Sequence, residues 1–254
     1  MLSHERKTYL LSILSKTGSI VAKDISRSLG VSEDTIRRDL RELANDGCLK
    51  RVHGGAVPIA SANAPMPRRI SIATPEKANI GKSAAAMIKT GEVVFVDGGT
   101  TAIQLARNIP QNLKATIVTH SPQVALELIN HTNVDVEIVG GKLLRHSVVT
   151  CGAATVAWLD RYRTDMCFIG ATGIHPDQGI TTGVSEEAEV KRAIIARSGS
   201  AYILASSEKF GAVSHFEITS WDNVDGLIVA EDAKPKATRL FAHLGCEIYA
   251  GGSW

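Results

Sequence analysis

The sequence has few of the features that are typical of membrane proteins, secreted proteins or metal-binding proteins. Its 254 residues include only four cysteines and 5% aromatic residues. No apolar stretch approaches the roughly 18–20 residues of a membrane span, and the first residues lack the apolar core of a signal peptide. The cysteines are scattered without metal-ligand spacing and indicate reduced thiols. We therefore expect a cytoplasmic protein without a metal or cofactor.

Motifs of common enzyme sites are absent from the sequence as well. There is no Gly-Lys-Ser/Thr of a nucleotide P-loop, no Gly-x-Gly-x-x-Gly turn, and no paired histidines at metal spacing. Ser121 and Cys151 lack a nucleophile elbow or a paired base. The glutamates at 186, 187 and 189 lie at a predicted helix start, where acidic residues stabilise the helix dipole. We expect no catalytic residue.

Charge is distributed unevenly along the chain, although the net charge is only +2. Residues 1–69 contain 12 of the 28 Lys and Arg residues but seven of the 26 acidic residues, so that the remainder is slightly acidic. A basic end on a larger acidic body is typical of an appended polyanion-binding module. A solvated charged face gives similar counts.

A proline-rich stretch separates the two parts. Four of the eight prolines fall between Pro58 and Pro75, among small and polar residues. Proline lacks a backbone donor and disfavours helix in the residue before it, which predicts an extended linker. The predicted boundaries are residues 1–57 for the first domain, 58–75 for the linker and 76–252 for the second domain.

The first domain has the pattern of a helix-turn-helix. Helices are predicted at 3–16, 22–29 and 33–45. The spacing of Ile36, Leu40 and Leu43 buries one face of the third helix, and Ser32 is its expected N-cap. A short strand follows at 48–53 and ends in a glycine turn.

The exposed face of the third helix is basic, and a helix in this position enters the major groove of DNA. Polar side chains on its leading turn would face base edges, arginines would reach phosphates or guanines, and a wing at 50–55 would contact the flanking backbone. The expected DNA contacts are Ser32, Asp34, Thr35, Arg37, Arg38, Arg41, Arg51 and His53. The alternative is a helical bundle with a solvated arginine face.

These residues resemble a known family. Residues 31–40 (VSEDTIRRDL) and 49–56 (LKRVHGGA) are similar to the N-terminal signature of DeoR-type bacterial transcription regulators. The resemblance implies a winged helix-turn-helix followed by an effector-sensing domain.

From residue 76 onward, apolar strands alternate with amphipathic helices. The predicted strands are 93–96, 115–118, 134–139, 167–169, 201–204, 226–229 and 247–249. Continuous apolar strands of this kind imply an α/β domain with a mostly parallel sheet covered on both faces.

The strand ends suit an anionic ligand, which binds such sheets beyond the carboxyl ends of the strands. Glycines allow close backbone approach, and the amides of the following helix point outward. The residues placed here by this reasoning are Asp97, Gly98, Gly99, Thr100 and Thr101, the hydroxyls of Thr119 and Ser121, and the charge of Lys209. Each turn taken alone is also compatible with an ordinary glycine-rich connection.

The family resemblance extends over this domain. Residues 97–101, 119–121, 140–143, 170–173 and 209–211 are similar in order to motifs of the DeoR sensor domain, which is related to sugar-phosphate isomerases. It implies a phosphorylated sugar effector and adds Gly170, Glu186 and Lys191 to the expected pocket. Two departures from the family pattern lie nearby: His120 replaces a common Asn, and residues 206–209 read SSEK.

The sequence therefore predicts a DNA-binding regulator, most simply a repressor of a carbohydrate-use operon controlled by a sugar phosphate. Because paired helices read half-sites about one turn of DNA apart, a homodimer or larger assembly is expected. The alternatives are a sugar-phosphate isomerase or deaminase with a DNA-binding end, and an architectural DNA-binding protein without a ligand.

Overall fold

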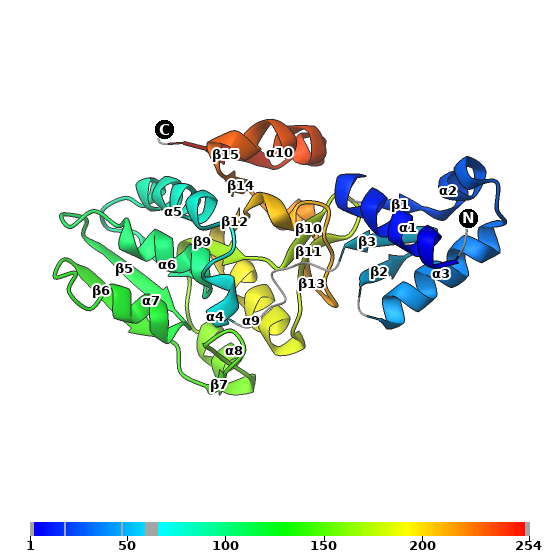
Figure 1. Ribbon diagram of the computed structural model, residues 1–254. Helices are drawn as coiled ribbons and strands as arrows, with labels where there is room; N and C mark the ends of the chain where they lie inside the picture. The colour runs from blue at the N-terminus through cyan, green and yellow to red at the C-terminus, as the bar shows by residue number, and fades with distance from the viewer. Residues whose placement is uncertain (1–2, 18, 47, 59–65, 252–254) are drawn as a thin grey trace.

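The computed structural model describes residues 3–17, 19–46, 48–58 and 66–251. Its described residues form two separate hydrophobic cores, one built from the N-terminal part and one from the rest of the chain. Figure 1 shows the N-terminal domain, in blue, beside strands β10, β11 and β13 of the larger domain. No helix in the described part of the chain combines the length and apolar character of a membrane span.

The N-terminal domain is a winged helix-turn-helix. Its elements are α1 (Ser3–Thr17), β1 (Ile20–Val21), α2 (Ala22–Leu29), α3 (Glu33–Asn45), β2 (Leu49–Val52) and β3 (Gly55–Pro58). Leu10, Ile36 and Leu40 are fully buried where the three helices meet. The strands form an antiparallel sheet in the order β1-β3-β2, and β2 and β3 make the wing. Gly55 lies against β1, where a Cβ atom would come within 1.7 Å of the Ile20 carbonyl oxygen.

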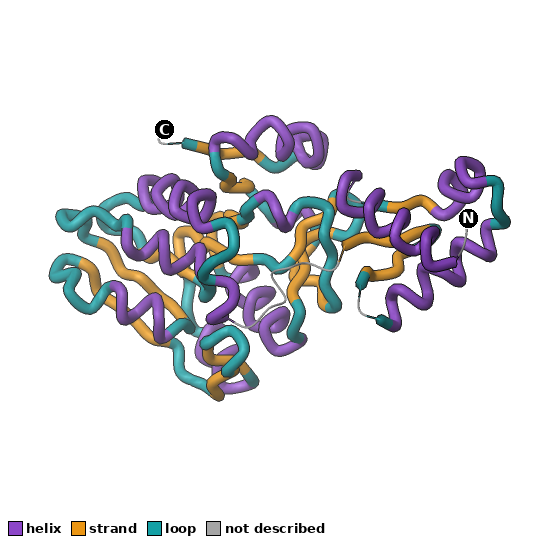
Figure 2. Tube along the Cα trace, viewed as in Figure 1, coloured by secondary structure: helices purple, strands orange, loops and turns teal. Residues whose placement is uncertain are grey.

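The larger domain is built on a fully parallel sheet in the order β15-β14-β12-β9-β4-β5-β6. Its strands are β4 (Val93–Val96), β5 (Ala115–Thr119), β6 (Val134–Ile138), β9 (Thr164–Gly170), β12 (Ser198–Leu204), β14 (Gly226–Val229) and β15 (Glu247–Ala250). Figure 2 shows these strands in the middle of the domain with helices packed around them. Phe95, Phe168 and Ile203 are fully buried along its centre, as the run of apolar residues in each strand predicts.

The direction of strand order reverses between β4 and β9. From β4 the chain moves outward to β5 and β6, whereas from β9 it moves the other way to β12, β14 and β15. Because parallel crossovers are right-handed, the helices of the two halves lie on opposite faces of the sheet. The loops after β4 and β9 consequently diverge, and they leave an opening at the carboxyl edge of the sheet.

Helices cover the sheet, and small antiparallel pairs extend it. The helices are α5 (Thr74–Met87), α6 (Thr100–Arg107), α7 (Pro122–Glu127), α8 (Ala153–Leu159), α9 (Ser185–Ala196) and α10 (Lys234–Phe241). One small sheet has the order β10-β11-β13, from β10 (Gly173–His175), β11 (Gly179–Thr182) and β13 (Phe216–Thr219). The other pairs β7 (Lys142–Leu144) with β8 (Val149–Cys151).

The end of the predicted linker is helical and packs with the larger domain, contrary to the extended conformation expected for residues 58–75. Residues 59–65 lie outside the described part, but α4 (Met66–Arg69) is a helical turn, and α5 begins at Thr74. Pro75 occupies the first turn of α5, where a missing N–H costs nothing. Met66 is fully buried in the core of the larger domain. We call residues 66–73 the connector.

The other elements agree with the sequence to different degrees. Helices at 22–29 and 33–45 and strands at 93–96 and 226–229 have the predicted bounds, and the remaining predicted sheet strands differ by one to three residues at an end. Among the elements that were not predicted are α5, α8 and the small antiparallel sheets.

Helices α5 and α6 pack backbone to backbone at Gly81. A Cβ atom there would lie 2.5 Å from the carbonyl carbon of Gln104 and 2.6 Å from the amide nitrogen of Leu105. Gly81→Ala is therefore expected to destabilise the larger domain by about 1–3 kcal/mol, the usual cost of overpacking. Thermal unfolding followed by circular dichroism measures this as a lower Tm. Gly140→Ala is the control, because a Cβ at Gly140 meets nothing within 4 Å. Equal Tm values for the two variants would contradict the tight contact.

Candidate functional site

The recognition helix α3 begins with the cap that the sequence predicts. The Ser32 hydroxyl accepts a hydrogen bond from the Thr35 amide at 3.2 Å and lies 2.8 Å from the Thr35 hydroxyl. On the inner face, buried Asp39 forms an ion pair with Arg6 of α1, and the second contact, from Arg6 Nη2 to Asp39 Oδ1, is 3.1 Å long. This hydrogen bond with Asp39 raises the pKa of Arg6 against the effect of burial. The pair holds α3 against α1.

The outer face of α3 presents the predicted arginines to solvent. Arg37, Arg38 and Arg41 are all exposed. Arg37 is held by Glu33 one turn earlier, with 2.7 Å between Arg37 Nη2 and Glu33 Oε1. Arg38 and Arg41 have no such partner among the described residues, so their guanidinium groups are available to another molecule.

The wing lies next to this face. Arg37 lines one groove together with Arg51 and His53 of the wing, and a neighbouring hollow is lined by Asp34, Thr35, Arg37, Arg38 and Arg41. All the residues predicted to contact DNA are therefore exposed or half-buried on one side of the domain, on α3 and the adjoining wing. This surface has the shape and charge that a major-groove reader needs.

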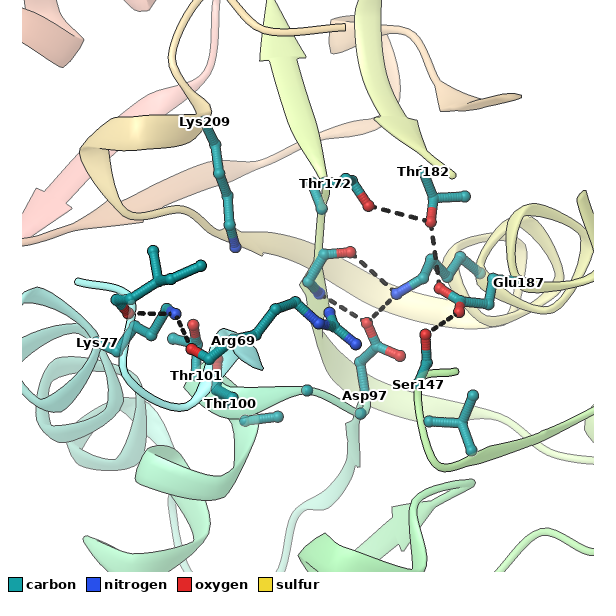
Figure 3. Close-up of a pocket in the computed structure, with 18 of the residues that line it drawn as sticks. Arg69, Lys77, Asp97, Thr100, Thr101, Ser147, Thr172, Thr182, Glu187 and Lys209 are labelled. Carbon is teal, nitrogen blue, oxygen red and sulfur yellow. Dashed lines mark hydrogen bonds and ion pairs between the residues drawn. The ribbon is translucent and has the colours of Figure 1, made fainter. Parts of the chain in front are cut away.

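A second site opens at the carboxyl edge of the parallel sheet, where strand order reverses. It is a pocket between the ends of β4 and β9, with further walls from β5, the β7–β8 pair, β11, α9, the connector and the turn η2 (Ser207–Lys209). The lining residues are Arg69, Ile72, Lys77, Asp97, Gly98, Gly99, Thr100, Thr101, Ala102, His120, Ser147, Val149, Gly170, Ala171, Thr172, Thr182, Glu187, Lys191, Glu208 and Lys209. Figure 3 shows how these side chains converge.

Asp97 lies at the base of the pocket and is fully buried. Its Oδ2 accepts a hydrogen bond from the Gly170 amide at 2.7 Å and forms an ion pair with Lys191, while Oδ1 lies 2.8 Å from His120 Nε2. Burial alone would raise the pKa of Asp97, but the charge of Lys191 and the hydrogen bond to His120 outweigh it and hold the pKa well below its usual range. Asp97 is therefore a fixed anion.

His120 has acceptors at both ring nitrogens. Nδ1 lies 2.9 Å from the carbonyl oxygen of Thr150, which only accepts, and Nε2 faces the Asp97 carboxylate. The imidazole therefore bridges the Thr150 carbonyl and the Asp97 carboxylate. His120 is fully buried, and it joins the end of β5 to the anion at the end of β4.

Hydroxyl groups surround a second buried carboxylate, that of Glu187 on α9, which forms one wall of the pocket. Glu187 Oε2 accepts from the Thr182 hydroxyl at 3.1 Å, and Oε1 accepts from Ser147. The Thr172 hydroxyl lies 3.4 Å from that of Thr182. Figure 3 shows Ser147, Thr172 and Thr182 gathered around Glu187, on the side of the pocket away from Lys77.

The wall opposite Glu187 carries two cations, Arg69 and Lys209, that form no ion pair with a described residue. The Nε and Nη2 atoms of Arg69 are buried and have no hydrogen-bond partner in the described part of the chain. Lys209 is buried, and its ammonium forms no ion pair with a described residue. Burial lowers the pKa of Lys209 to about 8, although nearby Glu208 opposes that shift. Burial lowers the pKa of Arg69 in the same way, against the charges of Glu187 and Asp97.

These cations face the start of α6. Thr100 and Thr101 begin that helix, and its first amides point into the same part of the pocket. In Figure 3 the Arg69 side chain extends between the two threonines and Asp97, and the Lys209 side chain points toward it from above. Unpaired cations next to a helix N-terminus form a site for an anion.

The structure brings most of the predicted pocket residues together. Asp97, Gly98, Gly99, Thr100, Thr101, Gly170, Lys191 and Lys209 all line the pocket. Thr119 and Ser121 do not: the Thr119 hydroxyl accepts from the Ser121 amide, and the Ser121 hydroxyl caps α7. Glu186 is exposed and lies outside the pocket, and its neighbour Glu187 takes the inward position instead.

Sequence reasoning missed several lining residues. Glu187 was interpreted as a stabiliser of the helix dipole, although it lies one turn before Lys191 and therefore on the same face of α9. Arg69 lay within the predicted linker, and Lys77 lies in a helix that was not predicted. His120 was noted only as a departure from the family pattern.

Comparisons with known proteins agree with this architecture. Residues 6–62 match the family described as DeoR-like helix-turn-helix domain, and residues 72–231 match the DeoR C terminal sensor domain. The chain belongs to the DeoR family. Among its DeoR-family relatives, the transcriptional regulator GlpR of Haloferax volcanii is 33% identical over 89% of each chain. GolR of Listeria innocua is 30% identical over 98% of each, and the glycerol-3-phosphate regulon repressor of Escherichia coli is 31% identical over 91% of each.

The solved structures that resemble this chain are more distant from it in sequence. A ribose 5-phosphate isomerase from Methanocaldococcus jannaschii aligns with 53% of each chain at 18% identity and a TM-score of 0.38. The family assignment rests on the sequence matches and the observed architecture. Membership of this family makes the chain a DNA-binding transcriptional regulator with an N-terminal DNA-binding domain and a C-terminal sensor domain.

Arg38→Ala tests whether the outer face of α3 contacts DNA. Because Arg38 has no described partner within the protein, its loss is expected to weaken operator binding by about 1–3 kcal/mol if it contacts a guanine. If it contacts a phosphate, binding falls for all sequences and the salt dependence becomes shallower by about one unit. Arg37→Ala is expected to have a smaller effect, since Glu33 already holds that side chain.

Fluorescence anisotropy on operator DNA at several salt concentrations measures both quantities. Arg163→Ala is the matched control, because it removes an exposed arginine from the larger domain. Wild-type affinity and salt dependence in both Arg38→Ala and Arg41→Ala would remove the outer face of α3 from the interface.

Proposed function

We propose that the sensor pocket binds a phosphorylated sugar or a related phosphorylated metabolite, and that this ligand lowers the affinity of the protein for its operator. The proposal rests on two cations, Arg69 and Lys209, that face the first turn of α6. Two guanidinium nitrogens of Arg69 are buried without a hydrogen-bond partner among the described residues, and buried Lys209 forms no ion pair with any of them. A phosphate group supplies the charge and the acceptor oxygens that these donors lack.

The opposite wall fits the remainder of such a ligand. The hydroxyls of Ser147, Thr172 and Thr182 and the carboxylate of Glu187 form a polar surface a short way from the cations. Groups that both donate and accept hydrogen bonds suit the hydroxyls of a sugar or polyol. The Escherichia coli relative is named as a repressor of a glycerol-3-phosphate regulon, which agrees with a phosphorylated polyol in this class of pocket.

The carboxylates Asp97 and Glu187 of the pocket are better suited to binding than to catalysis. A general base works best with a pKa near the working pH, whereas the pKa of Asp97 is held well below its usual range and both oxygens are occupied. Both oxygens of Glu187 also accept hydrogen bonds from hydroxyls. We infer a regulator without enzymatic turnover.

The rest of the proposal follows from DNA recognition. We infer contacts from Ser32, Asp34, Thr35, Arg37, Arg38, Arg41, Arg51 and His53, and a homodimer or larger assembly that reads paired half-sites. The regulated genes are those of carbohydrate use, and the protein acts where its DNA is, in the cytoplasm.

Calorimetric titration of the DNA-free protein tests the pocket directly. We expect binding of one or more members of a panel of glycerol 3-phosphate, hexose phosphates and pentose phosphates, and no binding of the matching unphosphorylated compounds. Affinity is expected to fall as the pH rises above about 8, because Lys209 then loses the charge that pairs with the phosphate. Each further pH unit costs up to about tenfold in affinity, equivalent to about 1.4 kcal/mol.

The sign of this pH dependence is assigned to Lys209. Burial also lowers the pKa of Lys77, but the Lys77 ammonium already donates to the carbonyls of Arg69 and Ile72. A phosphate monoester, with a second pKa of about 6, is already fully charged in this range, and an arginine stays protonated. Lys209→Arg is therefore expected to flatten the profile between pH 7.5 and about 9, because an arginine side chain keeps its charge throughout this range. Equal affinity for phosphorylated and free sugars would contradict the phosphate site. A wild-type profile that does not change with pH would remove Lys209 from it.

A further inference from the structure

The connector takes part in both the pocket and the link between the domains. Its residues 66–73 run from α4 to the start of α5 and end next to the pocket. At its other end the chain continues, through residues outside the described part, to strand β3 of the wing. A shift of the connector therefore also moves the end of the chain that leads into the DNA-binding domain.

Hydrogen bonds from both of its ends hold the connector onto the sensor domain. The Met66 amide donates to the His146 carbonyl at 2.9 Å, directly before Ser147 of the pocket wall. The Lys77 ammonium donates to the carbonyls of Arg69 and Ile72, at 2.9 and 2.5 Å. Ala73 closes the segment with a φ of 49°, a left-handed conformation that is unfavourable for a residue other than glycine.

Arg69 is the connector's contribution to the pocket. Two of its three guanidinium nitrogens are buried without a partner among the described residues, and the side chain points between Asp97 and the start of α6. Leaving a buried charged donor unsatisfied costs free energy. The ligand-free arrangement is thus incomplete at the residue that joins the pocket to the chain leading toward DNA.

We propose that Arg69 is the residue that transmits effector binding: a bound phosphate takes the Arg69 guanidinium as a ligand, fixes the connector against the sensor domain, and so changes how the DNA-binding domain is held. The inference rests on the phosphate site proposed above and assigns its coupling to one side chain. Lys209 binds the same phosphate from η2, which is distant from the connector in the sequence and is hydrogen-bonded to α5 through Ser207 and Glu76. We assign Lys209 a contribution to affinity only.

A second route between the domains competes with this one. Lys50 of the wing donates to the Ser214 carbonyl, and the Ser214 amide donates to the Thr181 hydroxyl at 2.9 Å, next to Thr182 of the pocket. This chain of contacts also joins the wing to the pocket. Its role is separated from that of Arg69 by the variant Lys50→Gln.

The test compares Arg69→Gln with Lys209→Gln. Calorimetry on DNA-free protein gives the affinity for the tightest-binding sugar phosphate of the panel, with inorganic phosphate as a second probe. Anisotropy gives the coupling factor, which is the operator Kd at saturating ligand divided by the Kd without ligand. Coupling factors in allosteric proteins are typically about 5 to 150. Arg163→Gln is the matched exposed-arginine control.

Both pocket variants are expected to bind the ligand at least about tenfold more weakly, as loss of a charge-assisted contact to phosphate implies. At saturating ligand, Lys209→Gln keeps the wild-type coupling factor, whereas that of Arg69→Gln falls to about one. If the Arg69→Gln protein, saturated with ligand, keeps the wild-type coupling factor, the proposal is wrong. It is also wrong if Lys50→Gln loses coupling while Arg69→Gln keeps it. If no sugar phosphate or inorganic phosphate binds wild-type protein, the phosphate site itself is wrong and this inference falls with it.

Hydrogen exchange of the wild-type protein gives a readout that needs no variant. With saturating ligand, amides of α6 report that the site is occupied, and the amides of Met66 and Ile72, both hydrogen-bonded in the connector, report whether it is fixed. We expect slower exchange in both segments. If the ligand slows exchange of the amides of α6 (residues 100–107) but leaves exchange in the connector (residues 66–73) unchanged, the connector does not have the proposed role.

Discussion

The carboxylate of Asp97 is the interaction on which the sensor domain depends. It lies where the two halves of the sheet diverge, and it binds a backbone amide of β9, a lysine of α9 and a histidine that follows β5. A carboxylate buried this deeply is stable only because each of these donors is fixed by its own element. Satisfied in this way, Asp97 holds three strands and a helix at the spacing that leaves the pocket open above them.

The charge of the pocket is divided in a way that matches its proposed ligand. Its anions Asp97 and Glu187 are already saturated by donors from the protein, so they form the frame. The cations Arg69 and Lys209 form no ion pair with any residue that the structure describes. Because protein interiors strengthen electrostatic interactions, two desolvated cations beside a helix N-terminus favour an anion strongly. The site is thus incomplete at these cations, and also at Glu208, whose Oε2 is buried without a hydrogen-bond partner among the described residues.

The sequence predicted local and repetitive features well, and tertiary ones poorly. The Ser32 cap, the arginine face of α3 and the apolar strands of the sheet follow from spacing within a few residues, and the structure has them. Glu186 and Glu187 show the limit: adjacent helix positions point about 100° apart, and the pairing of Glu187 with Lys191 at i and i+4 was the available signal for choosing between them. Arg69 had no such signal, because its role arises from packing of the connector against strands distant in the chain.

The most direct test of the account is operator binding by the intact protein with and without sugar phosphates. Fluorescence anisotropy on DNA from upstream of its own gene, at fixed salt, compares each phosphorylated compound with its unphosphorylated counterpart. We predict that at least one sugar phosphate raises the operator Kd by about fivefold or more, whereas the free sugar leaves it unchanged. Specific DNA binding that no phosphorylated compound alters, or that the free sugar alters equally, would contradict it.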